Sequence, residues 1–422
     1  MRILFVTNYY PPSNQGWGYM QLCEEVADGL HARGHEISVL TSTQRDGPEI
    51  PRPYSVYRLL PIDPDWHSNR SAAWQFLLGR QKRERQSVAD LRRLSAEFRP
   101  DLVFVWHAIG LPRAVLQEAE ASRSAPTAYY LAGYLPELPD EYVAYWQGEP
   151  INPLAKVLKR PLSRLALWQL KREGKPIALR YDHVICVSAY VREYLVSRGL
   201  ISTDAVVIHN GIDPQVFSAQ KRSRPPFTGA QVKCIIAGRI TREKGVHTVV
   251  AAFAQLRAQG IRNVDLTVLG DGEAAYRAEL KEMITRHDLQ DQVRFQPSVP
   301  RDEVPSILAQ CDVLILPSEY AEPIARSMQE AMAMGLLVIG TTTGGSRELL
   351  VHEETGLAFE AGNADALAAQ IQRAVRQPDW ARRLAETGRE TVHQRFTIQR
   401  TVEKTEAYLL QVLQDREEKP VG

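Results

Sequence analysis

Short apolar runs alternate along the whole chain with segments in which apolar residues recur every three or four positions. The short runs are typical of buried strands in parallel sheets, and the longer period is typical of amphipathic helices. This alternation predicts an α/β protein built of strand–helix–strand units. The expected strands cover residues 3–7, 36–40, 102–105, 127–131, 183–187 and 205–209 in the first half, and 233–237, 265–269, 293–296, 313–316, 337–340 and 356–359 in the second.

A stretch rich in Arg, Ser and Pro over residues 214–231 has no apolar period and is expected to link two domains. A chain of 422 residues is also too long for a single core. We therefore expect two doubly wound, Rossmann-like parallel-sheet domains that face each other across a cleft, over residues 1–213 and 232–392. A terminal helical segment follows over residues 393–422. In such sheets, ligands bind beyond the carboxyl ends of the strands.

Composition narrows the class of protein. With 44% hydrophobic and 24% charged residues the chain is globular, and a formal net charge of +1 gives no reason to expect nucleic acid. The four cysteines lie far apart, without the paired spacing of zinc or redox sites. Met1 and Arg2 lead directly into a strand, and no apolar run approaches the length that spans a bilayer. These features predict a soluble cytoplasmic protein.

Two glutamates, Glu322 and Glu330, follow the apolar run DVLILP in the stretch EPIARSMQEAMAMG. Apolar residues at steps of three and four predict a helix that begins near Ile324, and eight residues are a little over two turns, so both glutamates point to nearly the same side. Carboxylates accept hydrogen bonds from hydroxyls, while the amides at a helix N-terminus bind phosphate. The pattern suits a polyhydroxyl ligand next to an anion. The alternative is a surface helix with two solvated acids.

A second motif, AGRITREKG, follows an expected strand at Gly238. Arg239 comes directly after this glycine, and Lys244 precedes the next helical pattern. An Arg and a Lys in one loop at the carboxyl end of a strand are well placed to hold a diphosphate. The alternative is a pair of ordinary loop cations.

Together the two motifs resemble those of the retaining, nucleotide-sugar-dependent glycosyltransferases of the family-4 type, which have the GT-B fold. The resemblance covers nearly the whole chain, through MRILFVTNYYPP, HEISVLTS, VIHNGID, LGDGE, TTTGGSREL and TGLAFEAGNADALAAQI. It implies transfer of a hexose-type sugar from a nucleotide-diphosphate donor to an acceptor hydroxyl, in the biosynthesis of cell-surface glycans, glycolipids or specialised glycosides. It also implies an acceptor-side first domain, a donor-binding second domain, a last helix that crosses back to the first domain, and no cofactor.

The resemblance assigns roles residue by residue. Arg239 and Lys244 would stabilise the leaving diphosphate, together with the helix N-terminus. Glu322 would bind the sugar, and Glu330 the ribose. The residues expected to contact the donor are Gly16, Gly18, Gly238, Val299, Ile324, Ala325, Arg326, Ser327 and Glu330. The chain departs from the family pattern where Ile324 and Ala325 replace the usual Phe-Gly, and where Trp17 separates the first two glycines.

Two further candidates lie in the first half. His107 follows the strand 102–105 and matches a family position that reaches the transferred sugar or its phosphate, although a lone His in this place is commonly a structural hydrogen-bonder. Asp63 and Asp65 spell the D-x-D motif of metal-dependent glycosyltransferases. They lie in a Pro-rich loop without a preceding strand, so we expect a surface turn and no metal site.

Alternative functions remain on the same architecture: a glycoside phosphorylase, a nucleotide-sugar epimerase or a non-catalytic sugar-nucleotide-binding protein. The acceptor is suggested by residues 151–180, which carry eight cations and one acid, Glu173, among Leu and Trp residues. Residues 161–173 can form an amphipathic helix that either packs its Leu residues into the first domain or lies on an anionic bilayer. In the second case the acceptor is lipid-linked or displayed at the inner face of the membrane; otherwise it is a small molecule or glycan.

Overall fold

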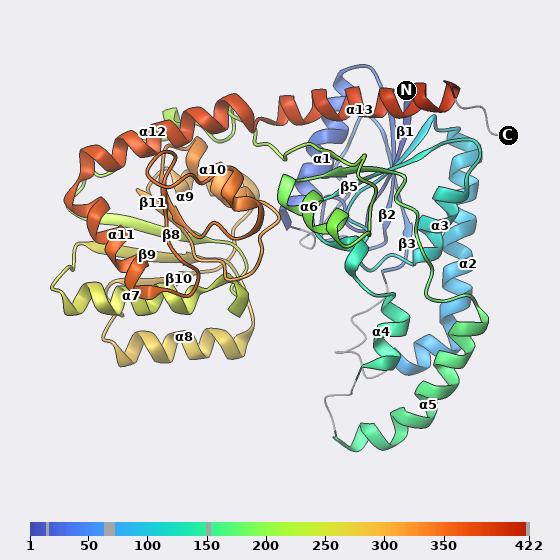
Figure 1. Ribbon diagram of the computed structural model, residues 1–422, viewed down its shortest axis with the longest axis horizontal. Helices are drawn as coiled ribbons and strands as arrows, with labels where there is room; N and C mark the ends of the chain where they lie inside the picture. The colour runs from blue at the N-terminus through green and yellow to red at the C-terminus, as the bar shows by residue number, and fades with distance from the viewer. Residues whose placement is uncertain (14–16, 63–71, 149–152, 419–422) are drawn as a thin grey trace. The chain divides into compact units, whose positions relative to one another are not determined.

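The computed structural model describes residues 1–13, 17–62, 72–148 and 153–418 (Figure 1). The chain divides into two compact units. Unit 1 contains Met1–Val187, Arg192–Ile208 and the chain from Val402 onward, and unit 2 contains Ser188–Val191 and His209–Thr401. In Figure 1, helices lie on both sides of each sheet.

The described part of unit 1 is built around a parallel seven-stranded sheet in the order β3-β2-β1-β4-β5-β6-β7. Its strands are β1 (Arg2–Val6), β2 (Glu36–Ser42), β3 (Ser55–Leu60), β4 (Leu102–Val105), β5 (Thr127–Leu131), β6 (His183–Cys186) and β7 (Val206–Val207). The central strands β4 and β5 are buried at every residue, because helices cover both faces of the sheet. The helices that carry residues of this unit are α1 (Trp17–Ala32), α2 (Ala72–Phe98), α3 (Arg113–Ala121), η1 (Leu135–Glu137), α4 (Glu141–Gln147), α5 (Pro153–Arg172), α6 (Ala189–Ser197) and α13 (Ile398–Glu418).

Unit 2 contains a parallel six-stranded sheet in the order β10-β9-β8-β11-β12-β13, again among the described residues. Its strands are β8 (Val232–Ala237), β9 (Val264–Leu269), β10 (Val293–Gln296), β11 (Val313–Leu316), β12 (Leu337–Gly340) and β13 (Leu357–Ala358). Its helices are η2 (Ala219–Lys221), η3 (Arg242–Lys244), α7 (Val246–Ala258), α8 (Ala274–Arg286), η4 (Arg301–Glu303), α9 (Val304–Leu308), α10 (Arg326–Ala333), η5 (Gly344–Glu348), α11 (Ala364–Arg376) and α12 (Pro378–Arg395).

The expected α/β class with two doubly wound parallel sheets is confirmed, and three elements differ from expectation. Strand β3 was not predicted; it pairs in parallel with β2 at the edge of its sheet. Helix α5 begins at Pro153, before the expected start, and carries Pro161 inside it. Helix α13 extends to Glu418. No helix in the described part of the chain is long and apolar enough to cross a membrane.

Residues 214–231, expected as a linker, belong to unit 2. Asp312, immediately before β11, is fully buried and holds this segment in place. Its carboxylate accepts two hydrogen bonds from Arg224, at 2.9 and 3.1 Å, and one each from the backbone amides of Phe227 and Lys233, both at 2.9 Å. A buried carboxylate requires such donors, because an unpaired charge in the interior is very costly.

Helix α13 carries residues of both units, and its part from Val402 onward packs within unit 1. A Cβ on Gly29 of α1 would lie 2.5 Å from the side chain of Val402, so glycine allows this close approach. Further along α13, Glu406 accepts hydrogen bonds from Arg33 and His35, both at 2.7 Å. The end of the chain therefore completes the surface of a unit whose sheet begins at Arg2.

Candidate functional site

Three loops of unit 2 meet at one edge of its sheet. Strands β8, β11 and β12 are parallel neighbours, so the segments that follow them emerge side by side. In parallel α/β sheets this is the edge where ligands bind. The three loops cover residues 238–245, 317–325 and 341–348.

The loop after β8 depends on two glycines with positive φ. Gly238 has φ 146° and lies against Gly270, where a Cβ would sit 1.9 Å from the Gly238 carbonyl oxygen. Gly245 has φ 67°, and a Cβ there would sit 2.1 Å from the carbonyl oxygen of Pro317. Positive φ favours glycine at both positions, and the absence of a Cβ at Gly245 and Gly270 allows these close approaches.

Lys244, at the end of η3, pairs with the carboxylate of Glu322. The Glu322 side chain is buried, and it also accepts hydrogen bonds from Ser318 at 2.6 Å and Tyr320 at 2.5 Å. The Lys244 ammonium lies 3.1 Å from the Tyr320 hydroxyl and 5.0 Å from the centre of its ring. Two residues that were predicted in separate motifs, Lys244 and Glu322, are therefore in direct contact, and Glu322 is fixed by three side chains.

The third loop closes over the backbone of Glu322. Gly344 has φ 62°, and a Cβ there would lie 2.2 Å from the Glu322 carbonyl oxygen. The amide of Gly345 donates a hydrogen bond to the same oxygen at 2.7 Å, and Thr341 donates to the carbonyl of Ser318 at 2.7 Å. The Glu322 loop is thus held by two hydrogen bonds from the third loop, one from the Gly345 amide and one from the Thr341 hydroxyl.

Helix α10 begins at Arg326, with Ala325 as its N-cap residue and Ser327 in its first turn. Ala325 has φ −79°, which any L-residue adopts, so the glycine of the family pattern is not required by the backbone here. Both Ala325 and Ile324 are buried. The N-cap residue Ala325 makes no side-chain cap hydrogen bond, and the amides at a helix N-terminus suit an anion.

Glu330, one turn further along α10, is buried between two arginines. Arg301 lies 2.5 Å and Arg326 lies 3.4 Å from the same carboxylate oxygen, Oε1. Arg301 also stacks over Phe217, with 4.7 Å from its guanidinium carbon to the ring centre. Arg301 lies two residues after Val299, but it was not predicted as a partner of Glu330, because no sequence spacing connects it to α10.

The remaining donor-site candidates are distributed over both units. Arg239 is half exposed and lies 3.9 Å from Glu243. Val299 lies in the loop between β10 and η4. Gly18 lies in the first turn of α1, in unit 1, while Gly16 falls outside the described residues, as do Asp63 and Asp65. Among the residues that the structure does describe, no group of three or more His, Cys, Asp or Glu side chains is placed to hold a metal ion.

His107 follows β4 in unit 1 and stacks on Tyr19 of α1, with 5.4 Å between ring centres. Its backbone carbonyl accepts a hydrogen bond from the Asn8 amide at 3.0 Å. Burial lowers the pKa of the His107 imidazole to about 4, because the charged form loses its water. The side chain is therefore neutral near pH 7, and it can accept or donate one hydrogen bond.

We expect this histidine to make the protein acid-sensitive. Below about pH 6.5 the unfolded chain binds a proton at His107 that the folded chain takes up only near pH 4, so folding stability falls across this window. The loss should reach about 3 kcal/mol at pH 4. Urea unfolding of wild type and His107→Gln between pH 7 and 4 measures it as a difference in slope. His287→Gln, at an exposed position, should leave the slope unchanged; equal slopes for His107→Gln and wild type would contradict the assignment.

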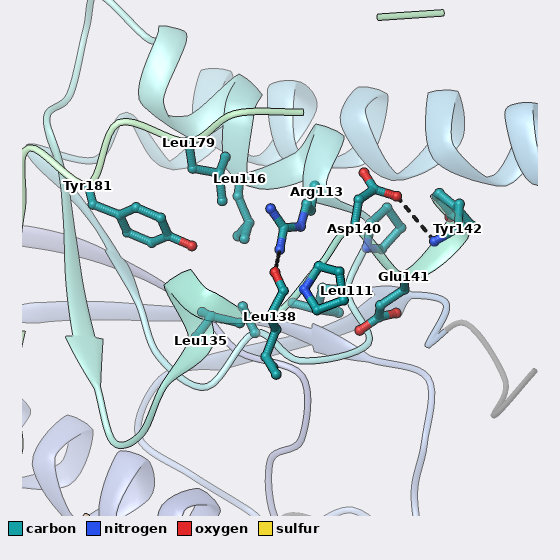
Figure 2. Close-up of a pocket in the computed structure, with 13 residues that line it drawn as sticks. Leu111, Arg113, Leu116, Leu135, Leu138, Asp140, Glu141, Tyr142, Leu179 and Tyr181 are labelled. Carbon is teal, nitrogen blue, oxygen red and sulfur yellow. Dashed lines mark hydrogen bonds between the residues drawn. The ribbon is translucent and has the colours of Figure 1, made fainter. Parts of the chain in front are cut away.

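A small pocket in unit 1 lies beside α3 and α4 (Figure 2). Figure 2 shows Arg113 and the Tyr181 hydroxyl pointing into it, and Arg113 donates a hydrogen bond to the Leu138 carbonyl. The Tyr181 hydroxyl and the Oδ2 atom of Asp140 are buried without a hydrogen-bond partner among the described residues. Space for the centre of a water molecule amounts to about 20 Å³, which suits one or two waters and not a sugar ring.

Comparison with known proteins accounts for nearly all of the chain. The family described as Glycosyltransferase Family 4 matches residues 21–216, and the family described as Glycosyl transferases group 1 matches residues 218–391. The two matches are adjacent, and the second contains Arg239, Lys244, Glu322 and Glu330.

Individual relatives at low sequence identity are also glycosyltransferases or a glycogen synthase. A putative glycosyltransferase, YtcC, of Bacillus subtilis is 27% identical over 54% of this chain and 59% of its own length. A putative colanic acid biosynthesis glycosyltransferase, WcaL, of Salmonella typhimurium is 29% identical over 60% of this chain and 62% of its own length, so both matches span about three-fifths of the relative. Glycogen synthase of Mycobacterium tuberculosis is 25% identical over 100% of this chain and 97% of its own length.

Solved structures share the fold across both units. A sucrose-phosphate synthase from Thermosynechococcus elongatus has a TM-score of 0.72 at 21% identity, over 99% of this chain and 100% of that one. A glycosyltransferase from Rickettsia africae has a TM-score of 0.70 at 18% identity, over 98% and 100%. With both halves matched by adjacent families and the two sheets in place, this chain belongs to the family-4 type glycosyltransferases of the GT-B fold.

Proposed function

We propose that the protein transfers a hexose-type sugar from a nucleotide-diphosphate donor to an acceptor hydroxyl, with retention of configuration. The observation that supports it most is the ion pair of the half-buried Lys244 with the buried Glu322, at the edge of the sheet where α10 also begins. This arrangement offers a cation and helix amides to a diphosphate and a fixed carboxylate to sugar hydroxyls. HepE of Anabaena, which has a similar fold at 21% identity, has been solved with UDP-glucose.

In the proposed reaction the bond between the sugar C1 and the diphosphate oxygen breaks, and a bond from C1 to the acceptor oxygen forms on the same face. The acceptor hydroxyl proton passes to the departing phosphate. The transition state is oxocarbenium-like, and negative charge grows on the leaving group. Lys244, Arg239 and the first amides of α10 are proposed to stabilise that charge, which is commonly the largest catalytic term.

The other residues keep the roles expected of them as proposals. Glu322 holds donor sugar hydroxyls, and its bonds to Ser318 and Tyr320 keep it oriented while Lys244 engages phosphate. Glu330 holds the ribose, and the segment ending at Val299 faces the base. His107 is proposed to contact the transferred sugar as a neutral imidazole, in keeping with its lowered pKa.

Calorimetry with a plain nucleoside diphosphate, UDP first, separates the two glutamates. Glu330→Ala should weaken binding about tenfold or more, because a hydrogen bond to a charged group is lost. Glu322→Ala should bind the diphosphate within about threefold of wild type, since its partner is the sugar, but should abolish transfer. Glu279→Ala, at an exposed carboxylate on α8, is the control for both measurements. Equal losses of diphosphate affinity in the two site variants would overturn this division of roles.

Product analysis distinguishes the alternatives on the same architecture. A transferase releases nucleoside diphosphate from a nucleotide sugar in step with glycosylation of an acceptor. A phosphorylase would need inorganic phosphate, an epimerase would form a new nucleotide sugar without an acceptor, and a binding protein would form no product. Transfer should persist in EDTA, because the proposed charge stabilisation comes from side chains and amides of the chain.

The acceptor is proposed to be a small molecule, a glycan or a lipid-linked glycan, met in the cytoplasm or at the inner face of the membrane. The four cysteines are all buried and free, which fits a reducing compartment. Helix α5 bears on the choice between these acceptors.

A further inference from the structure

Helix α5 exposes large apolar side chains on its outer face. Trp168 is 56% exposed, Leu165 is 54% exposed and Leu162 is 37% exposed. Positions 161, 165, 168 and 172 follow the three–four spacing of one helix face, so Leu165 and Trp168 lie along a common stripe. Exposed single apolar residues are ordinary, but a Trp and two Leu gathered within two turns of one helix form a patch of the kind that marks an interaction site.

Cations surround this stripe. Arg164, Lys171 and Arg172 are exposed, and Arg160 lies at its N-terminal end. The Arg172 guanidinium lies 4.7 Å from the centre of the Trp168 ring, which places charge and indole together. The single acid of this region, Glu173, turns inward instead and pairs with the buried Arg80 of α2. The outer face of α5, which we call the basic apolar face (residues 160–172), therefore carries positive charge without a compensating carboxylate from its own helix.

The opposite side of α5 is firmly attached to unit 1. Ala166 and Leu170 are buried in a cluster with Tyr142 and Trp146 of α4. Lys159 donates hydrogen bonds to the backbone carbonyls of residues 145 and 148, both at 2.7 Å. Beyond the helix end, the buried Lys175 pairs with Glu84 of α2. The packing expected of the Leu residues thus holds for Leu170 and not for Leu165.

We propose that the basic apolar face of α5 binds the surface of an anionic bilayer. A cationic helix face with Leu and Trp at its centre matches a lipid interface, where Trp lies at headgroup depth and cations are attracted to the anionic headgroups. The inference rests on the geometry of α5 alone. If the protein is the proposed transferase, binding at a bilayer also places its acceptor at a lipid surface; this statement about the acceptor rests on the proposed function.

Vesicle co-sedimentation of the full chain tests the proposal. At low salt, vesicles of phosphatidylcholine with 30% phosphatidylglycerol should bind at least about tenfold more protein than vesicles of phosphatidylcholine alone. This preference for anionic vesicles should shrink at 0.5 M salt, because salt screens the charges. The triple variant R164E/K171E/R172E should lose this preference. Trp168→Ala and Leu165→Ala should each weaken binding severalfold, because apolar contact with the interface is lost.

Matched controls keep the result specific. R286E/R383E reverses two exposed helix cations of unit 2, and Leu410→Ala removes a 41% exposed Leu of α13; both should bind vesicles like wild type. Calorimetry with UDP should be unchanged by the α5 triple variant, which shows that it is folded and that vesicle binding is separate from the donor site. Equal binding to neutral and anionic vesicles, binding to neither, or equal losses in the controls would each overturn the proposal.

Discussion

Lys244→Ala should lower the turnover of sugar transfer by about 10²–10³, the range found when a single charge-stabilising donor is removed. Arg239→Ala should lower it by about a hundredfold. The two variants should differ in stability, because Lys244 neutralises the buried Glu322 while Arg239 is 48% exposed. We therefore expect a lower melting temperature for Lys244→Ala and a wild-type value for Arg239→Ala.

The matched control is Arg242→Ala, in the same short helix η3. Arg242 is 62% exposed and pairs with Glu279 on α8, so its loss should change turnover by less than about threefold. Steady-state rates at saturating donor measure all three variants. Rates within threefold of wild type for both Lys244→Ala and Arg239→Ala would remove these residues from the mechanism.

Asp312→Ala should cost about 3–5 kcal/mol of stability, the usual result of removing one partner from a buried charge pair. The substitution leaves the Arg224 guanidinium and two backbone amides without their acceptor. Burial already lowers the pKa of the neighbouring Arg222, against the opposing effect of Asp312, so this region tolerates unpaired positive charge poorly. Urea unfolding measures the loss, and hydrogen exchange in β8 and β11 assigns it to unit 2.

Glu282→Ala serves as the control for that measurement. Glu282 is 72% exposed and pairs with Arg286 one turn away, so its loss should cost no more than about 0.5 kcal/mol. A cost below about 1 kcal/mol for Asp312→Ala would show that water or a rearranged loop replaces the carboxylate.

Strands with continuous apolar runs could be predicted from sequence, because strands that are buried on both faces of a sheet consist mainly of apolar residues. The runs Leu102–Val105 and Val313–Leu316 lie in the structure at the bounds expected of them. Strand β3 was missed because it lies at an edge and is half-buried along most of its length. Its Arg58 donates hydrogen bonds to the backbone carbonyls of Tyr10 and Pro11, at 3.1 and 2.7 Å. This charged residue interrupts the apolar run by which a strand is recognised in the sequence.

The sequence predicted which loops form the candidate site, but not the contacts between their side chains. Both Lys244 and Glu322 follow buried strands, and such strand ends are recognisable in sequence. Their direct contact depends on β8 and β11 being neighbours in the sheet, which local patterns do not encode. The same limit explains why two contacts were missed: the fold alone brings Tyr320 to Lys244 and Arg301 to Glu330.

The packing of α13 on α1 has a consequence for synthesis. Unit 1 needs Val402 against Gly29 and Glu406 against Arg33 and His35, yet Val402 and Glu406 are translated after the main segment of unit 2. The sheet of unit 1, which precedes unit 2 in the chain, therefore gains these packing partners only after unit 2 has been translated. During that delay, which is many seconds at about 5–20 residues per second, the surface of α1 stays uncovered and open to chaperones or to aggregation.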